Sequence, residues 1–518
     1  MKIRYVFVIT LVLLLAACSF QSSAVEENDG DLQQITINQT DSNGCDDGDN
    51  GYEEYIPVVL PQHIPDYMVN LEINPEERFV SGVMTISFQN TSAYALDRVF
   101  FNMSLNAFAE GFPYSPFLPA FERNIFNHGP DFGRIDVLHA TINLNPAEFD
   151  VKHTLLTIYL DEYLASEDVV EIGLAFEARI PRISHRTGGN DYAMWLGNFL
   201  PTLPVFSDGH WHIYPYYPVG SPFFTQTSNF LVNITAPYNY TVVSTGHGVR
   251  DEGEVSASTS IEAGLVRDFA FAVLSPAYNS RRILTDAGIE ISIYYREAFE
   301  DDEIVDAILA TAQAAFEFFA ARIGTYPYLT FVIVESELFM RDSIKYPGMM
   351  FVDSQHLRSN AVHGSIVRDV GYQWFYNMVG NNPVTEPWLS HGLVSFLQLS
   401  LTMDEDEIHQ HMLGIHQQLE RVFNRMYYTE LSRSLDYFNS WADFRNVQLF
   451  RGKLLFYDLW QKMGSDEFDQ FVRTYFERYA FSIATAQGMM AVAKEIHPEP
   501  LDDFFHDWIN SPTLPFIF

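Results

Sequence analysis

The sequence has few cysteines and few basic residues for its length. Only Cys18 and Cys45 occur among 518 residues, and 30 Lys and Arg stand against 67 Asp and Glu, which gives a net charge of -37. Such an acidic chain is not expected to bind nucleic acid or to be held by charge on an anionic lipid surface. Two cysteines say little about the redox compartment, because one of them, Cys18, is expected to be acylated and so could not form a disulfide.

Sequence motifs of several enzyme classes are also absent. The chain contains no Gly-x-Ser-x-Gly nucleophile elbow and no glycine-rich phosphate-binding loop. Its composition is nevertheless that of a folded protein, with 47% hydrophobic and 15% aromatic residues. The length predicts about two to four domains of roughly 100 to 200 residues each.

The N-terminus carries the clearest targeting signal. Lys2 and Arg4 precede an apolar stretch at residues 5–14 that is too short to span a membrane comfortably, and the following LAAC at 15–18 resembles a bacterial lipobox. We expect a lipoprotein signal peptide at 1–17 and acylation of Cys18, which would anchor the protein on the extracytoplasmic face of a bacterial cell membrane. An ordinary signal peptide with a chance cysteine is the alternative. Residues 18–55 are acidic and polar and predict a disordered tether.

The remaining chain changes from a strand pattern to a helix pattern. Short alternating runs separated by turn residues occupy 56–298, for example at 68–73, 80–88 and 230–236. A long apolar periodic helix that ends at Gly324 opens the segment 299–518, which is mostly helical. The expected fold class is α+β, with an antiparallel β-sandwich-like domain followed by a mostly helical domain.

Residues 366–396 predict two helices, the first ending near Gly380 and the second starting after Pro387. This stretch resembles the zinc-binding core of the aminopeptidase N-like gluzincin metallopeptidases. Members carry HExxH followed by Gln-Trp, and a third-ligand Glu inside an EPWL-x-E-G segment. The QW at 373–374, the EPWL at 386–389 and Gly392 match this pattern. The resemblance covers about residues 57–518 and implies the family's N-terminal β domain at 56–298 and a thermolysin-like domain at 299–518.

The chemical residues of this pattern are replaced. The three zinc-ligand positions hold Arg368, Tyr372 and His391, and the general-base position holds Asp369. An arginine is always protonated and has no lone pair to donate, and a tyrosine phenol stays protonated at neutral pH. One histidine does not hold zinc specifically. We therefore expect no metal and no cofactor; zinc would bind only if an unrecognised site held it.

Two further positions of the family pattern also differ. In the family, a Glu in a Met-Glu-Tyr-Pro-Gly segment holds the substrate's amino terminus, and here that position is Lys345. The oxyanion-stabilising Tyr position holds Leu449. The segment after Lys345 predicts an edge strand that binds peptide by strand addition, and its residues are Tyr346, Pro347, Gly348, Met349 and Met350.

These replacements favour a membrane-anchored protein with an aminopeptidase fold that binds peptide or protein without cutting it, a pseudo-peptidase. Lys345 and Arg368 would give the cleft positive charge and favour an anion, unless Arg368 is neutralised by Asp369. Two alternatives remain. One is an active metallo-aminopeptidase with an unrecognised metal site, and the other is a scaffold subunit of an envelope complex.

Overall fold

The computed structural model describes residues 63–517 apart from 208, 298–300, 340 and 424–428. Contacts divide the chain into two units, Met1–Val59 and Leu60–Phe518, and the elements below all belong to the second. The predicted signal peptide at 1–17, the acylated Cys18 and the tether at 18–55 lie outside the described residues.

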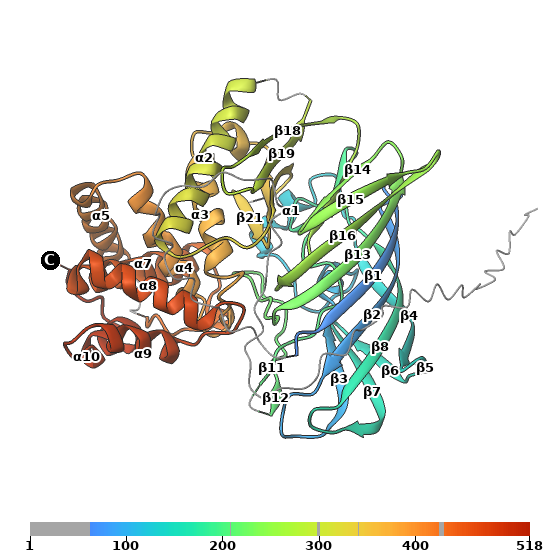
Figure 1. Ribbon diagram of the computed structural model, residues 1–518, viewed down its shortest axis with the longest axis horizontal. Coiled ribbons are helices and arrows are strands. Elements are labelled where there is room, and N and C mark those ends of the chain that lie inside the picture. Colours follow the sequence, from blue (N-terminus) through green and yellow to red (C-terminus); the bar gives the residue numbers. More distant parts are fainter. Residues whose placement is uncertain (1–62, 208, 298–300, 340, 424–428, 518) are drawn as a thin grey trace, which may run out of the picture. The chain divides into compact units, whose positions relative to one another are not determined.

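The largest element of the N-terminal part is an eight-stranded sheet (Figure 1). Its strands are β1 (Asp66–Asn74), β2 (Phe79–Gln89), β4 (Arg134–Ile142), β5 (Asn145–Pro146), β8 (Val169–Arg179), β13 (Ser228–Pro237), β15 (His247–Glu252) and β16 (Ser256–Val266). Their order is β15-β16-β13-β1-β2-β8-β4-β5. Every second side chain of β1 is buried, which is the period of a strand with one face in a core. β1 and β13 pair in parallel, so the predicted sandwich is not purely antiparallel.

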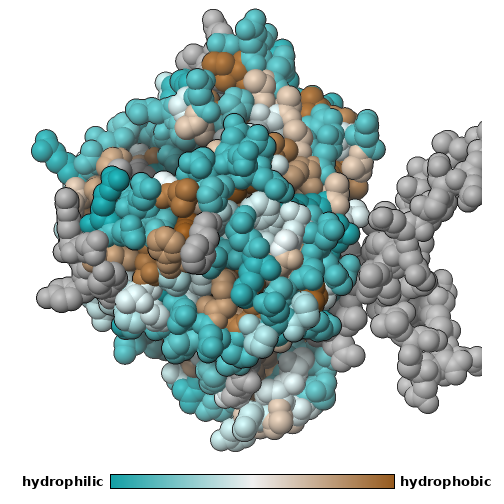
Figure 2. Space-filling view, turned by 90° about the vertical axis from the view of Figure 1, so that its left-hand side faces the viewer, coloured by the Kyte–Doolittle hydropathy of each residue, from teal (hydrophilic) through white to brown (hydrophobic). Residues whose placement is uncertain are grey.

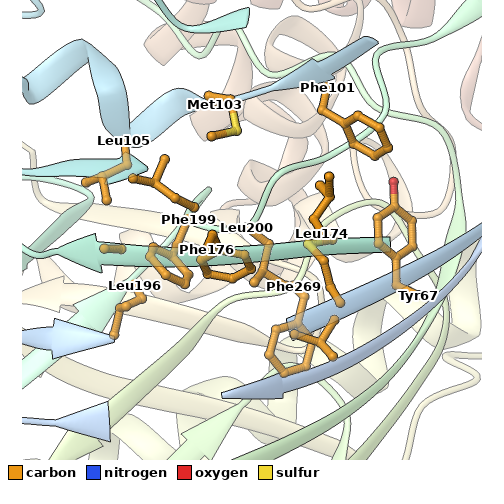
Figure 3. Close-up of a cluster of buried hydrophobic side chains, with 14 of the residues drawn as sticks. Tyr67, Phe101, Met103, Leu105, Leu174, Phe176, Leu196, Phe199, Leu200 and Phe269 are labelled. Carbon is orange, nitrogen blue, oxygen red and sulfur yellow. The ribbon is translucent and has the colours of Figure 1, made fainter. Parts of the chain in front are cut away.

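Smaller sheets bury the inner face of this large sheet. Their strands are β3 (Leu96–Asn102), β6 (Phe149–Lys152), β7 (Leu155–Leu164), β9 (Thr187–Gly189), β10 (Ala193–Leu196), β14 (Thr241–Ser244) and β17 (Phe271–Leu274), with a short pair, β11 (Phe206–Ser207) and β12 (His210–Trp211). Tyr67 of β1, Phe101 of β3 and Phe176 of β8 lie in one buried cluster (Figure 3). A Cβ at Gly82 would lie 2.3 Å from the Phe176 ring, so a glycine is needed for this packing.

A five-stranded sheet follows and carries part of the candidate site. Its strands are β18 (Tyr278–Leu284), β19 (Glu290–Arg296), β20 (Thr330–Ser336), β21 (Ser343–Tyr346) and β22 (Met349–Asp353), in the order β18-β19-β20-β22-β21. The domain boundary predicted at 298/299 therefore falls inside one sheet.

The predicted edge strand at residues 346–350 is wrong. Gly348, with a φ of 65°, turns the chain back, so β22 runs between β20 and β21. Met349 and Met350 are fully buried there. One edge of the sheet is β21, which contains Lys345, and the other is β18.

The rest of the chain is helical, as predicted. The helices are α2 (Asp302–Arg322), α3 (Val362–Trp374), α4 (Trp388–Leu397), α5 (Glu405–Phe423), α6 (Trp441–Phe444), α7 (Gly452–Met463), α8 (Ser465–Tyr479), α9 (Ala486–Ile496) and α10 (Asp502–Phe505), and a short α1 (Glu122–Ile125) lies earlier. The predicted α+β order, a β-rich part followed by a helical part, is confirmed. Hydrophilic residues cover most of the side on which the helices lie, with apolar patches between them (Figure 2).

Helix α2 begins and ends at the residues that the sequence indicates. The Asp301 side chain accepts a hydrogen bond from the Ile304 N–H at 3.2 Å, and Gly324 follows the helix with a φ of 153°. Within the part of the chain that the structure describes, α2 alone is long and apolar enough to cross a membrane by length and composition. It packs on α3 and buries seven side chains, as a core helix does.

The connection between α3 and α4 differs in part from the prediction. α3 ends at Trp374, six residues before Gly380, because the chain folds back beneath the helix end. The N–H groups of residues 377–379 donate to the carbonyls of residues 372–374 at 2.8–3.1 Å and so satisfy the last turn. α4 begins at Trp388, directly after Pro387, as predicted.

Candidate functional site

Helix α3 presents Arg368 to the edge strand β21 through a closed polar network. The Arg368 Nε donates to Asp369 Oδ1 at 3.0 Å, and its Nη2 donates to Ser343 Oγ at 2.7 Å. Ser343 Oγ in turn donates to the other oxygen of Asp369 at 2.5 Å. The Asp369 side chain is 2% exposed, while that of Arg368 is 24% exposed. Asp369 is therefore bound by a guanidinium and a hydroxyl. It neutralises Arg368, which is one of the alternatives that the sequence left open.

Tyr372 lies one turn after Arg368 and bonds His391 of α4. The phenol oxygen is 2.5 Å from His391 Nδ1, and both residues are buried. Burial raises the pKa of Tyr372 above its usual range. Burial, with the cations Lys345 and Arg368 nearby, holds the pKa of His391 well below 6.5. Both groups are therefore neutral near pH 7 and share one hydrogen bond.

Lys345 enters the same space from β21. Its Nζ lies 4.2 Å from the centroid of the Tyr372 ring and 4.4 Å from that of Tyr376, so the ammonium is held over two aromatic faces. Burial lowers the pKa of Lys345 to about 7, and Arg368 contributes to this shift against the opposing effect of Asp369. No described residue forms a hydrogen bond or an ion pair with this ammonium.

The position expected to stabilise an oxyanion has no polar group. Leu449 lies in a π-helical turn, Arg445–Arg451, that packs against α4 and precedes α7, and it is half-buried. The next residue, Phe450, is also apolar, so the position lacks a polar group even if the family's Tyr is aligned one residue later. Neither side chain can donate a hydrogen bond.

The scaffold residues of the pattern make the contacts that fix these elements. Gln373 Oε1 accepts the Gly348 N–H at 2.9 Å, which ties α3 to the turn between β21 and β22. Trp374 Nε1 donates to the Gly324 carbonyl at 2.8 Å. Gly392 lies directly against Gly452, where a Cβ would be 2.7 Å from the backbone carbon of Gly452. The motif residues that remain therefore stabilise the fold, whether or not the protein catalyses a reaction.

A family model described as Peptidase family M1 domain matches residues 309–508. That range includes α3, the turn and α4, and ends in the last turn before the C-terminus. Residues 309–508 are called the M1 domain below, after the family model that matches them.

Curated relatives of the M1 domain are distant. Over 191 residues the chain is 24% identical to Aminopeptidase RNPEPL1 of Homo sapiens and equally to that of Mus musculus. The match covers 33% of this chain and 26% of each relative, so it spans about a quarter of their length.

Solved structures share the fold over most of the chain. The M1 zinc metallopeptidase from Deinococcus radiodurans is 15% identical, with a TM-score of 0.60 over 87% of this chain and 95% of that one. A mutant from the same organism bound to the substrate Tyr-Ser-Ala gives a TM-score of 0.63 at 14% identity, with the same two coverages. A two-domain M1 zinc metallopeptidase mutant bound to L-arginine gives 0.64 at 15% identity, over 88% and 96%. At these identities the likeness concerns the fold.

The residues of this M1 domain do not fit the zinc of those relatives. The three ligand positions supply a guanidinium, a neutral phenol and an imidazole whose Nδ1 is already engaged in a hydrogen bond with that phenol. A catalytic zinc requires three donors such as imidazole or carboxylate and an open position for water. Among the described residues, no group of three or more His, Cys, Asp or Glu side chains could hold a metal ion.

Further cations around the M1 site were not foreseen from the sequence. Lys453 of α7 is 7% exposed, and burial, with Arg368 nearby, lowers its pKa to about 8. Burial and Arg186 lower the pKa of Arg341 to about 9, and its guanidinium lies 4.4 Å from the Trp441 ring centroid. Among the site residues that the sequence analysis missed, only Ser343 could have been found from the sequence. It is two residues before Lys345 and so lies on the same face of the strand.

The space beside Lys345 is small. A cavity of about 20 Å³ lies between Lys345, Tyr376 and Pro347 on one side and Arg267 and Asp268 on the other. That volume holds about one water molecule. A ligand that enters beyond Lys345 must therefore displace side chains of the protein.

Proposed function

We propose that this protein is a membrane-anchored pseudo-peptidase, an M1 fold whose cleft binds peptide or protein without hydrolysing it. The observation that carries the proposal is the bond between Tyr372 and His391, at two of the three zinc-ligand positions. The third position holds Arg368, whose charge is bound to Asp369. A general base at Asp369 would have to give up this ion pair before it could take a proton from water.

Retention of the scaffold supports a binding role. Gln373 and Gly392 still make the contacts that hold β21 next to α3 and α4 next to α7. A peptide that pairs with the edge strand β21 would pass Lys345 and the exposed part of Arg368. Strand addition at β21 replaces the earlier prediction for residues 346–350, whose methionines are buried.

Metal content and turnover test the loss of catalysis. Purified full-length protein is expected to hold no stoichiometric zinc by plasma mass spectrometry and to release no product from aminoacyl reporter substrates. The matched variant is His391→Ala, which is expected to change neither readout. About one zinc per chain, together with turnover that His391→Ala abolishes, would overturn the proposal in favour of an active metallo-aminopeptidase.

The anchor is a separate part of the proposal. Cys18, which follows the lipobox-like LAA, is proposed to carry acyl chains that hold the protein on the extracytoplasmic face of a bacterial membrane. Metabolic labelling with a palmitate analogue is expected to mark the wild type but not Cys18→Ser, with Cys45→Ser as the matched control. Labelling that persists in Cys18→Ser would contradict the anchor.

A further inference from the structure

We propose that the cations where β21 packs on α3 form a carboxylate site, and that the peptides it binds are selected by a carboxylate held next to Lys345, Arg341 and Lys453. The inference rests on the proposed function and names its ligand chemistry. It reverses the charge preference that a Glu at position 345 would have, since Lys345 repels an ammonium and attracts an anion.

The first step is that none of these three cations has an ion-pair partner among the described residues. No carboxylate of a described residue lies within 4.0 Å of the Lys345, Arg341 or Lys453 nitrogens. Lys345 and Arg341 contact aromatic faces instead, and Lys453 lies 5.9 Å from the Phe450 ring centroid. A charge that is withdrawn from water without an ion-pair partner is costly, so a protein that keeps Lys345 and Arg341 near each other has a reason beyond stability.

The second step is that the acids in this region are already engaged. Asp369 is bound by Arg368 and Ser343. Asp268 accepts hydrogen bonds from the side-chain amide of Asn198 and from the Phe269 N–H. Arg186 adds a further cation near Asp268 and bonds Asn198 at 3.1 Å, so it does not depend on Asp268 alone.

The third step is the contrast with the rest of the chain. With 67 acidic and 30 basic residues, a randomly chosen group of charges in this protein is expected to be acidic. Near this site lie the cations Lys345, Arg341, Lys453, Arg368 and Arg186 and the carboxylates Asp369, Asp268 and Asp342. The acidic surface would keep anions away from most of the molecule, and the cleft is the place where a carboxylate is attracted.

The site has a route to solvent. Arg368 is 24% exposed, and its Nη1 makes no hydrogen bond to a described residue. Lys345 and Arg341 are half-buried, not sealed. A carboxylate that reaches Arg368 from solvent would therefore meet one guanidinium nitrogen that has no partner among the described residues.

Retention of defined peptide pools tests the inference. Full-length protein on a resin is offered four octapeptide pools of equal randomised composition. The neutral pool is blocked at both ends. Each of the other pools differs from it in one feature: a free α-carboxylate, a Glu in place of Gln, or a free amino terminus. Mass spectrometry quantifies what is retained. We expect at least about tenfold higher retention of one or both carboxylate pools than of the neutral pool, and none of the amino pool. Which carboxylate pool is retained distinguishes a chain end from an acidic side chain.

Charge variants complete the test. Lys345→Gln is expected to reduce the carboxylate preference, and Lys345→Glu to reverse it towards the free-amino pool. The matched control is Arg282→Gln, an exposed cation on β18 that pairs with Glu290. Thermal unfolding of each variant verifies that it is folded. Equal retention of all pools by the wild type would overturn the carboxylate site and leave peptide binding standing. Retention of no pool would overturn both, and unchanged preference in Lys345→Glu would place the selectivity elsewhere.

Discussion

At the scale of single residues, the bond between Tyr372 and His391 replaces metal coordination as the link between α3 and α4. Tyr372→Phe is expected to lower the free energy of unfolding by about 1–3 kcal/mol, because it leaves the buried Nδ1 of His391 without its hydrogen-bond partner. Urea unfolding of the two proteins measures the difference. The exposed Tyr163 gives the control, since Tyr163→Phe should change stability by no more than about 0.5 kcal/mol. An equally small effect of Tyr372→Phe would mean that the short contact does not stabilise the fold.

Lys345 gives a prediction with a defined pH window. Its pKa falls from 10.5 to about 7 on folding, so between these values the unfolded chain binds more protons and stability rises with pH. The penalty is complete below pH 7, where both states are protonated. Lys345→Met should therefore raise the free energy of unfolding by about 1–3 kcal/mol at pH 6, and the gain should shrink towards pH 10.

The control for Lys345→Met is Lys152→Met on the exposed strand β6. Chemical unfolding at several pH values compares the two. The groups that act on Lys345 are Asp369, Arg368, Arg186 and Arg341. A gain from Lys345→Met that is the same at every pH would show that packing, not charge, is responsible.

The residue types at the candidate site could be read from the sequence, but their partners could not. The four-residue spacing correctly predicts that Arg368 and Tyr372 lie near one another. Adjacent helix residues such as Arg368 and Asp369 do not normally face each other. They pair here because Ser343 of strand β21 forms hydrogen bonds with both side chains. Such contacts depend on the three-dimensional packing of β21 on α3, which no local pattern encodes.

At the scale of elements, the crossing of α4 and α7 depends on two glycines. A Cβ at Gly392 would meet the Gly452 backbone at 2.7–2.9 Å, and neither helix backbone can give way cheaply. Gly392→Ala is expected to cost about 3 kcal/mol, at the upper end for overpacking. In Gly414→Ala on α5 the new methyl meets nothing within 4 Å, so stability should instead rise by about 0.5–1 kcal/mol. Thermal unfolding measures both signs, and a neutral Gly392→Ala would contradict the close crossing.

Elements were predictable where their signals are local. The alternation in β1, the end of α2 just before Gly324 and the start of α4 after Pro387 all stand where the sequence places them. The end of α3 and the place of β22 were missed. Both depend on tight turns, at residues 375–379 and at Gly348, whose direction determines which strand becomes the edge. The exposed edge is therefore a property of sheet order and not of the hydrophobic run at 346–350.

At the scale of the whole molecule, Arg267 joins the β-rich part to the M1 domain. Its Nη2 donates to the carbonyls of Met378 and Ser482, and its Nη1 donates to that of Thr225. The guanidinium occupies the space that a Cβ of Gly380 would need, where its Cζ would be 2.2 Å away. The five-stranded sheet also contains strands from both sides of the predicted boundary at 298/299, so we expect the wild type to unfold in one cooperative transition.

Arg267→Met should weaken this coupling, because it leaves buried carbonyls on the M1 side without their donor. We expect a lower urea midpoint and transitions by tryptophan fluorescence and far-ultraviolet circular dichroism that no longer coincide. The matched variant is Arg250→Met, whose guanidinium also bonds carbonyls, those of Tyr238 and Tyr240, but within the β-rich part alone. It should lower stability with the two probes still coincident. If Arg267→Met behaves in the same way, the two parts are joined by their apolar packing and not by this arginine.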